Sequence, residues 1–369
     1  MKFKNVTLFG ENFKFNSADV CVQNGVFADF CDGEEIDCGG LMMIPGLVDV
    51  HTHGAVGATA DDGEFDALDK ISKFEAEHGI TTFLPTLSTQ SYEQLTASAE
   101  CIRRAKPEMT GAKIGGIHME GPYFSLKYKG AQDPKNIRCP DAEEFFKINK
   151  SADGLVKLIS IAPENEGAEE FVKAVKDSVK VAVGHTDADY ETMVNAIGWG
   201  VTQLTHTYNA MRGLHHRNPG AIGAAIEGNV YCELICDGMH IHPVMVRLLY
   251  KAIGAERLVL ISDSVRPAYL PDGVYDSCGL KVFVKDGKAT LEDGTIAGSS
   301  STLFDCLKKA IEFGIPVEDA VRAATYNPAK AVGIEGECGV IKKGRKADFL
   351  LVDDKFDLKA VYIDGKRIK

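Results

Sequence analysis

Short runs of apolar residues recur through the middle of the chain, and most intervals between them repeat apolar residues with a helical period of about 3.6. The apolar runs lie at 46–50, 81–85, 114–118, 156–161, 181–184, 202–205, 230–236 and 258–262. The helix-like intervals include 64–78, 92–105, 168–178, 189–198 and 243–253. Alternation of this kind predicts an α/β fold, a parallel (β/α)₈ TIM-like barrel. Two further helix patterns, at 303–313 and 316–325, are expected to cover the barrel.

The two ends of the chain have a different pattern. Strand-like segments occur at 1–9, 19–23 and 26–30, with Asn24-Gly25 as a hairpin turn. The last residues are similar, with apolar segments at 348–352 and 360–363 before the turn signal Asp364-Gly365. We therefore predict a small β-sandwich domain built from residues 1–48 and 335–369, and a barrel domain at 49–334.

The composition and net charge of the chain argue against some classes of function. The chain has 369 residues, of which 45% are hydrophobic, and this is enough for a barrel with a second small domain. The formal net charge of −12 argues against nucleic acid as a partner. Neither a signal-peptide pattern nor a membrane-length apolar stretch is present, so a cytoplasmic protein without a membrane partner is expected.

Polar residues suited to catalysis collect where the predicted strands end. His51 and His53 follow the first strand, and Glu120 follows the third in the segment 118–122. His185 and His206 follow the fifth and sixth strands. Because the carboxyl ends of barrel strands open at one mouth, these side chains are expected to meet there.

This pattern of histidine and carboxylate is typical of a metal site. Two histidines at i and i+2 on a strand share a face and can chelate one ion. Buried, hydrogen-bonded histidines are also common, so the His51/His53 pair alone is weak evidence. The recurrence of His185 and His206 with a carboxylate makes the metal interpretation much stronger.

The ligand set predicts one or two divalent ions per subunit. His51, His53 and Glu120 can hold one ion, and Glu120, His185 and His206 can hold the other, with Glu120 as the bridge. Some related barrels bridge with a modified lysine on strand four, but the segment 160–164 contains none. Zinc suits these ligands best, with iron, manganese or cobalt as alternatives. Occupancy of the His51/His53 position is the open part of this prediction.

Asp263 follows the eighth strand and is the predicted catalytic residue. A carboxylate beside water activated by a metal can take its proton and pass it to a leaving amine. The alternative is a helix N-cap or loop aspartate.

At this point the chain resembles the N-acetylglucosamine-6-phosphate deacetylases of the amidohydrolase superfamily. The likeness runs in order through 45–54 (PGLVDVHTHG), 118–122 (HMEGP), 129–132 (KGAQ), 184–188 (GHTDA), 205–211 (THTYNAM), 237–240 (DGMH), 262–263 (SD), 270–273 (LPDG), 297–299 (AGS), 327–329 (NPA) and 344–349 (GRKADF). The H-x-H and G-R-x-A-D patterns mark only the superfamily, whereas the H-x-E-G-P, K-G-A and H-x-x-N-A-M blocks are more specific.

The resemblance implies substrate contacts for ten residues: Ala131, Gln132, Asn209, Ala210, Arg217, Asp237, His240, Ile296, Ala297 and Gly298. Arg217 would pair with a phosphate, which suits the forked donors of a guanidinium. The alternative for Arg217 is an ordinary surface charge. His78 and His242 are interpreted as structural.

The resemblance also implies an activity and an assembly. The expected reaction is hydrolysis of N-acetylglucosamine 6-phosphate to glucosamine 6-phosphate and acetate, with two metals because the H-x-H pair is present. Members of the family commonly form dimers, so a homodimer is expected. One alternative is an amidohydrolase acting on another N-acyl amino sugar or an acylamino acid. A non-catalytic scaffold is the other, but such a protein should have lost ligands that this chain retains.

Overall fold

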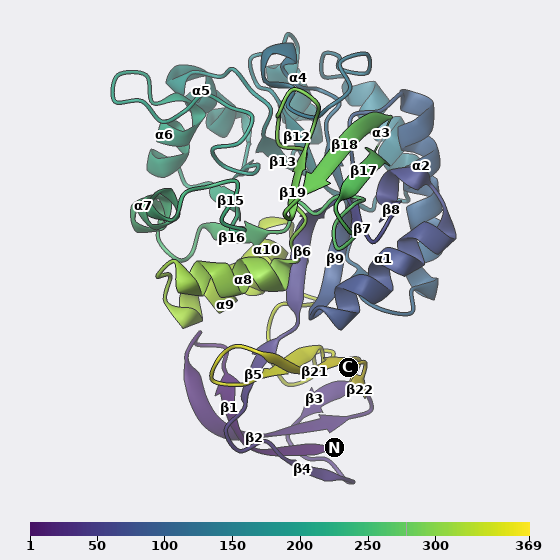
Figure 1. Ribbon diagram of the computed structural model, residues 1–369, viewed down its shortest axis with the longest axis vertical. Helices are drawn as coiled ribbons and strands as arrows, with labels where there is room; N and C mark the ends of the chain where they lie inside the picture. The colour runs from purple at the N-terminus through teal and green to yellow at the C-terminus, as the bar shows by residue number, and fades with distance from the viewer. Residues whose placement is uncertain (278) are drawn as a thin grey trace.

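A barrel and a smaller β-rich part make up the computed structural model, which describes residues 1–277 and 279–369. Figure 1 shows the barrel with its helices above and the small β-rich part below, where both termini lie. The two ends of the chain are therefore side by side, as the similar strand patterns at 1–30 and 348–363 predict.

The barrel wall in the described chain has eight parallel strands that neighbour one another in sequence order. They are β6 (Leu47–Thr52), β9 (Ile80–Leu87), β11 (Ile117–Glu120), β12 (Val156–Ile161), β13 (Lys180–Val183), β14 (Gln203–Leu204), β15 (Tyr231–Ile235) and β16 (Leu258–Ile261). A short strand, β10 (Lys113–Ile114), also pairs with β9. The Asp263 amide donates to the His51 carbonyl at 2.9 Å, which joins the end of the last strand to the first. The predicted barrel is confirmed.

Helices surround the barrel and bury their apolar faces against it. They are α1 (Phe65–Glu77), α2 (Tyr92–Ala105), α3 (Ala142–Ser151), α4 (Ala168–Val175), α5 (Tyr190–Trp199), α6 (Gly220–Glu227), α7 (Pro243–Ile253), α8 (Leu303–Glu312), α9 (Val317–Ala324) and α10 (Tyr326–Ala331), with short 3₁₀ turns η1 (Ala60–Asp62), η2 (Lys106–Glu108) and η3 (Leu126–Tyr128). Helix α6 was not predicted from periodicity because its sequence, GAIGAAIE, lacks a polar face.

The terminal strands form one eight-stranded sheet in the order β22-β21-β20-β5-β1-β2-β3, with β4 paired to β1. Their bounds are β1 (Lys2–Phe9), β2 (Phe15–Gln23), β3 (Val26–Ala28), β4 (Glu35–Asp37), β5 (Met42–Pro45), β20 (Phe349–Val352), β21 (Leu358–Ile363) and β22 (Lys366–Arg367). Strands β3 and β20 are four strand spacings apart, about 19 Å in a flat sheet. Their Phe27 and Phe349 rings nevertheless lie 5.8 Å apart. The sheet is therefore folded over a core of its own, as in a sandwich.

A second small sheet lies between the last barrel strand and α8, and the sequence patterns did not predict it. It consists of β17 (Gly273–Ser277), β18 (Leu280–Lys285) and β19 (Lys288–Thr290), all antiparallel. Figure 1 shows these strands in front of the upper part of the barrel. A two-stranded ribbon, β7 (Gly54–Ala55) with β8 (Ala58–Thr59), follows β6. Both additions extend the barrel at its carboxyl-end mouth.

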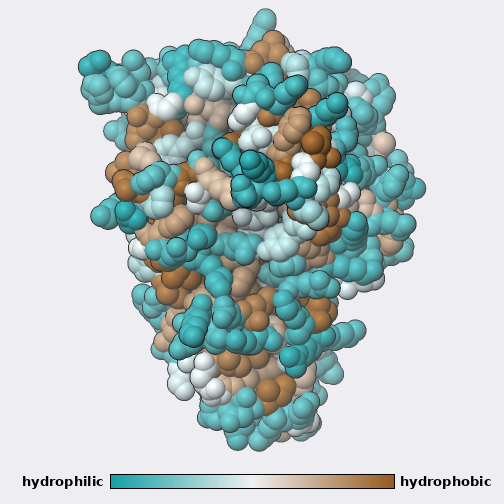
Figure 2. Space-filling view, viewed as in Figure 1, coloured by the Kyte–Doolittle hydropathy of each residue, from teal (hydrophilic) through white to brown (hydrophobic). Residues whose placement is uncertain are grey.

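One face of the molecule is predominantly polar at its outline. Figure 2 shows hydrophilic residues along most of the outline of one face, with smaller hydrophobic groups between them. Large exposed apolar side chains such as Phe30, Leu126 and Val274 come from separate parts of the chain. Among the described residues, no helix has the length and apolar character needed to cross a membrane.

An ion-pair group joins the barrel to the terminal sheet. The Lys113 ammonium lies 2.9 Å from Asp348, which is buried, and 2.8 Å from Asp364. Burial lowers the pKa of Lys113, but these carboxylates outweigh burial and place the pKa above the usual 10.5. The stabilisation is therefore complete below pH 10.5 and is lost as the pH rises through the higher folded-state pKa.

Replacing this lysine should weaken the fold measurably. We expect Lys113→Met to lower the free energy of unfolding by about 1–3 kcal/mol at neutral pH, because Asp348 stays buried without its cation. Urea denaturation measures the loss, and the difference from the wild type should disappear above the Lys113 pKa. Lys147→Met, which breaks an exposed helical pair with Glu143, is the control and should cost less than about 1 kcal/mol. Equal effects of the two substitutions would contradict the assigned role.

Candidate metal centre and active site

Five side chains from the ends of four strands meet at the barrel mouth. His51 lies in β6 and His53 directly follows it, while Glu120 ends β11. His185 and His206 each lie two residues beyond a strand. All five are buried. The structure therefore brings these five residues to one place, and their role as metal ligands stays a prediction.

The backbone turns sharply at three of the candidate residues. His185, His206 and Asp263 have φ values of 45°, 26° and 47°, in the left-handed region that residues other than glycine seldom adopt. Such conformations cost free energy and concentrate at functional sites, where the surrounding structure holds them. Each one follows a barrel strand and directs its side chain toward the common centre.

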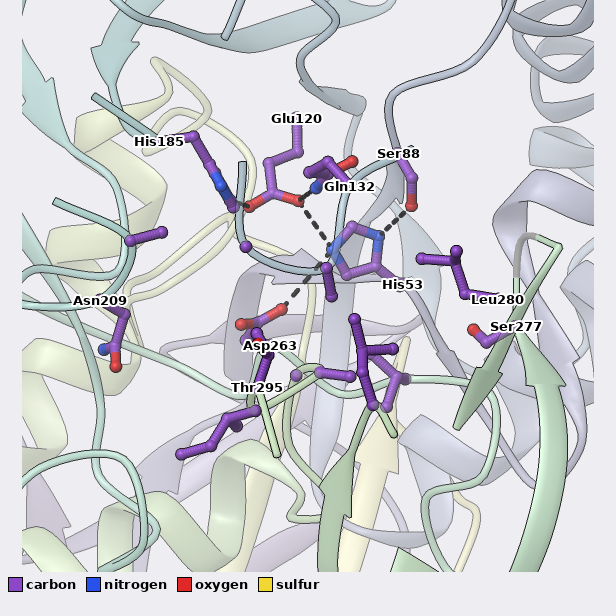
Figure 3. Close-up of a pocket in the computed structure, with 18 of the residues that line it drawn as sticks. His53, Ser88, Glu120, Gln132, His185, Asn209, Asp263, Ser277, Leu280 and Thr295 are labelled. Carbon is purple, nitrogen blue, oxygen red and sulfur yellow. Dashed lines mark hydrogen bonds and ion pairs between the residues drawn. The ribbon is translucent and has the colours of Figure 1, made fainter. Parts of the chain in front are cut away.

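Glu120 is the centre of the arrangement. Its Oε1 lies 3.4 Å from His51 Nε2, 3.2 Å from His185 Nε2 and 3.0 Å from His206 Nε2. Its Oε2 lies 3.2 Å from His53 Nε2. Figure 3 shows the Glu120 carboxylate between His185 and His53, with Asp263 on the other side of His53 from Ser88.

Two overlapping groups of potential ligands result. The His51 group contains His51, His53 and Glu120, and the His185 group contains Glu120, His185 and His206. In each group the ligand atoms lie within 4.8 Å of one another. Glu120 belongs to both, so the geometry agrees with a shared carboxylate between two ions.

The histidine Nδ1 atoms face away from Glu120, and their hydrogen bonds indicate whether a cation fits at the Nε2 atoms, which face it. The Nδ1 atom of His185 lies 3.0 Å from the Tyr128 carbonyl, which only accepts, so Nδ1 carries the proton. In the neutral ring, Nε2 then directs a lone pair at Glu120 Oε1, another acceptor. The Nε2 atom of His51 is likewise buried, with no hydrogen-bond partner in the described part of the chain. Acceptors that face one another in this way suit a metal cation between them.

The electrostatic environment favours positive charge at the same place. Burial alone lowers the pKa of His51, but Glu120 and Asp263 outweigh it and hold the pKa well above 6.5. Burial raises the pKa of Glu120, but the contacts with His51, His185 and His206 lower it well below 4.5. A carboxylate kept ionised among histidines is the environment in which divalent ions bind.

His118 belongs to the HMEGP motif but lies outside both groups. Its Nε2 atom lies 2.8 Å from the Ser160 hydroxyl, which lies 2.8 Å from the Thr205 hydroxyl. Burial, followed by the charge of His51, lowers the pKa of His118 well below 6.5. His118 therefore packs below the ligands as a neutral ring. Ser160 points inward from β12, the fourth barrel strand. The end of this strand has no lysine that could bridge two metals, as the sequence already indicated.

Asp263 lies at the boundary between the ligands and open space. Its Oδ1 is 3.6 Å from His51 Nε2 and 3.5 Å from His53 Nε2, and its side chain is 11% exposed. Gly298, with φ of 68°, lets the next loop pass directly over it. A Cβ at Gly298 would lie 2.9 Å from the Asp263 carbonyl, to which the Ser299 amide donates at 2.7 Å. The main chain of Asp263 is thus fixed while its carboxylate faces the cavity.

A cavity of about 330 Å³ opens in front of these groups. Of the residues predicted to contact substrate, eight line it: Ala131, Gln132, Asn209, Ala210, His240, Ile296, Ala297 and Gly298. Asp263, His53, Glu120, His185 and His206 line it as well, whereas His51 lies behind them. The structure therefore brings the predicted chemistry and most predicted substrate contacts to one space.

Two predicted substrate residues lie elsewhere. Asp237 accepts from His240 Nδ1 at 2.7 Å and from the His240 amide at 2.9 Å, so it orients His240 and is not itself among the described lining residues. Arg217 is exposed on the loop before α6, with its guanidinium against His216. Among the described lining residues there is no lysine or arginine. Asp237 thus supports His240 from behind, and its contact with the sugar stays a prediction.

Gln132 makes a contact that the sequence did not predict. The Thr89 amide donates to Gln132 Oε1 at 2.8 Å, which directs Gln132 Nε2 to Glu120 Oε2 at 2.6 Å. Gln132 therefore holds the shared carboxylate in addition to lining the cavity.

Sequence reasoning also missed several residues around the site. The Ser88 hydroxyl lies 3.1 Å from His53 Nδ1, and the Glu233 carboxylate lies 3.0 Å from His51 Nδ1. Ser277, Leu280 and Val282 of the inserted sheet line the cavity. One signal was available for Glu233, because a single acid in the apolar run 230–236 of a strand buried on both faces requires a polar partner.

Comparison with known proteins agrees with this geometry. The model of the amidohydrolase family matches residues 42–368. The N-acetylglucosamine-6-phosphate deacetylase of Bacillus subtilis (strain 168) is 38% identical over 318 residues, which cover 84% of this chain and 80% of that protein. The N-acetylgalactosamine-6-phosphate deacetylase of Escherichia coli O157:H7 is 32% identical, with 88% and 87% covered.

Solved structures show the same likeness. A mutant N-acetyl-D-glucosamine-6-phosphate deacetylase of Mycobacterium smegmatis, in complex with N-acetyl-D-glucosamine 6-phosphate, has a TM-score of 0.94 at 30% identity. The match covers 100% of this chain and 99% of that chain. The family match over most of the chain and these relatives together give the assignment: the chain belongs to the amidohydrolase family and, within it, to the N-acetylglucosamine-6-phosphate deacetylases.

Proposed function

We propose that this protein hydrolyses the acetamide of N-acetyl-D-glucosamine 6-phosphate to give D-glucosamine 6-phosphate and acetate. The observation that carries the proposal is the pair of ligand groups that share Glu120 and open, beside Asp263, into one cavity. The names of the relatives in Bacillus subtilis and Mycobacterium smegmatis indicate the same substrate. Because a charged sugar phosphate does not cross a bilayer unaided, we place the reaction in the cytoplasm.

The His51 group and the His185 group would hold the metal, with two ions when both are filled. Imidazole nitrogens with one carboxylate suit borderline divalent metals, and we propose zinc first. When bound, such ions polarise an amide carbonyl and make water more acidic.

Asp263 supplies the proton transfers. Its Oδ1 is close to His51 and His53, and the cavity wall includes the same side chain. It takes a proton from the attacking water as the oxygen bonds to the acetyl carbon. It then gives this proton to the sugar nitrogen as the carbon–nitrogen bond breaks, which leaves acetate and a free amine.

The remaining wall would orient the sugar. His240 is fixed by Asp237 through a 2.7 Å hydrogen bond and presents its ring to the cavity. Asn209 donates from its amide to the His206 carbonyl at 3.2 Å, so it is held beside the ligand loop. The apolar side chains of Leu280, Val282 and Ile296 from the inserted sheet and its following loop restrict access to water on one side.

We further propose a homodimer in which Arg217 of one chain reaches the cavity of the other. Two observations support this: the described lining carries no cation for a phosphate, and Arg217 is exposed on a loop with no carboxylate partner among the described residues. Sedimentation analysis tests the dimer directly, and a monomer with full activity toward the phosphorylated sugar would contradict it.

The activity itself is tested by a free-amine assay on metal-loaded protein. We expect amine and acetate in equal amounts from N-acetylglucosamine 6-phosphate, and a far lower kcat/KM for the unphosphorylated sugar. N-acetylgalactosamine 6-phosphate is the third substrate, because one relative carries that name. Equal rates with and without the phosphate would contradict recognition of the phosphate. The absence of free amine would contradict deacetylase activity.

Arg217→Ala should raise KM for the phosphorylated sugar by roughly 10- to 150-fold, the value of a charged hydrogen bond to phosphate. The kinetics with the unphosphorylated sugar should not change. Arg104→Ala, at an exposed arginine on α2, is the control. If Arg217→Ala alters neither KM, an amidohydrolase acting on another N-acyl compound becomes the better interpretation.

A further inference from the structure

Glu233 is a buried carboxylate that the reaction described above does not use. It lies in the middle of β15 with 0% of its surface exposed. Within the described chain its only ion-pair partner is a histidine, His51, and no lysine or arginine approaches it. A carboxylate in such a position costs free energy unless hydrogen bonds and nearby positive charge compensate it.

The contacts of Glu233 connect it to both ligand groups. Its Oε2 lies 3.0 Å from His51 Nδ1 and accepts from the His206 amide at 3.2 Å. Its Oε1 accepts from the side-chain amide of Gln203. One carboxylate therefore contacts the ring of a residue in the His51 group and the backbone of a residue in the His185 group.

The contact with His51 determines which ring nitrogen carries the proton. Both oxygens of Glu233 already accept, one from the Gln203 side chain and the other from the His206 amide, so His51 Nδ1 is the donor in its contact with Glu233. In the neutral ring the lone pair is then on Nε2, which faces Glu120 Oε1 at 3.4 Å and Asp263 Oδ1 at 3.6 Å. His185 achieves the same result with a backbone carbonyl, which carries no full charge. Among the four ligand histidines of the described chain, only His51 has a carboxylate at its outer ring nitrogen.

We propose that Glu233 is a positioning residue that selects the Nδ1-protonated form of His51 and thereby secures a metal ion in the His51 group. The inference rests on the metal centre of the proposed function. Glu233 adds a third carboxylate, after Glu120 and Asp263, around the His51 ring. The contact with Glu233 fixes the orientation of the ring, so that Nε2 faces Glu120 where a second cation would lie beside the one in the His185 group.

The test measures metal binding rather than turnover. Metal-free protein is titrated with Co²⁺ and followed by calorimetry and by visible absorption, which distinguish two binding steps. Diffraction at the cobalt edge then identifies which group each ion occupies. We expect two ions in the wild type, and in Glu233→Gln a roughly 10- to 100-fold weaker second step with the ion missing from the His51 group. The step for the His185 group should not change.

Two further variants separate positioning from a general effect on the fold. Glu233→Leu removes the acceptor altogether and should weaken the second step more than Glu233→Gln, in which one neutral oxygen can still accept. Glu75→Gln is the matched control, because Glu75 is also buried near β6 but its hydrogen-bond partner among the described residues is the Thr52 hydroxyl, at 3.4 Å. It should keep both binding steps. Thermal melting followed by circular dichroism verifies that each variant is folded.

The outcomes are distinguishable. Two ions in the wild type with unchanged affinities in folded Glu233→Gln would overturn the role of Glu233 and leave the metal centre intact. Equal weakening of both steps would overturn it too, because a purely structural residue acts on both groups alike. Failure of the wild type to bind a second ion would overturn this inference, and failure to bind any ion would also overturn the proposed function.

Discussion

Asp263→Asn should lower kcat by roughly 10²- to 10⁴-fold while the metal content stays at the wild-type value. The amide has almost the shape of the carboxylate, so the contacts with His51 and His53, 3.6 and 3.5 Å away, change little. What is lost is the ability to accept a proton from water and to deliver it to the leaving nitrogen. KM should change far less than kcat, because the defect lies in the transition state.

This variant is compared with Asp177→Asn, an identical change at an exposed position after α4. Metal analysis and steady-state kinetics on the same samples give the answer. If Asp263→Asn holds its metal and keeps full turnover, the proton transfers belong to another residue. If it loses its metal, Asp263 acts as a ligand and the kinetic loss has a different cause.

Glu120→Gln should lose metal from both ligand groups at once, whereas Asp263→Asn should keep its metal. Four imidazole Nε2 atoms lie within 3.4 Å of this carboxylate. Two of these rings, His51 and His185, already use their outer nitrogen in a hydrogen bond, to Glu233 and to the Tyr128 carbonyl. An amide has no negative charge and keeps only one oxygen that can accept. Since Glu120 is the one residue common to both groups, neither group retains a complete set of ligands.

Elemental analysis after gel filtration measures the expected loss, and activity should fall below that of Asp263→Asn. Excess Zn²⁺ in the assay should restore little, because the carboxylate itself is missing. The control is Glu75→Gln, which changes a buried glutamate in the same way but outside both groups. Retention of one ion per chain in Glu120→Gln would show that only one group depends on Glu120.

The barrel was predictable because its signals are local. Each strand is a short apolar run, and each polar residue that matters follows such a run within a few positions, as at His51, Glu120, His185, His206 and Asp263. The rule that parallel barrel strands end at one mouth converts these separate signals into one site. Helix α6 was missed because its nearly uniform apolar composition has no helical period.

Other features are not decided by local signals. The folding of the terminal sheet that brings Phe27 onto Phe349 depends on strand order, which the alternation pattern does not contain. The inserted sheet of β17–β19 has ordinary strand patterns, and only its position over the mouth makes it part of the site. The hydrogen bond between Asp237 and His240 is local in sequence. Whether the Asp237 side chain faces the cavity depends on the turn between the two residues.

The sequence by itself determined the barrel and the identity of the predicted ligands, because periodicity and residue type act over a few neighbouring positions. Only the tertiary structure decided how the ligands are supported. Glu233 meets His51 across 182 residues of chain, and Gln132 meets Glu120 only after Thr89 has fixed the amide. Such contacts depend on the closure of the barrel, which brings the inward side chains of distant strands within hydrogen-bond range. The same closure leaves Arg217 outside, on the surface.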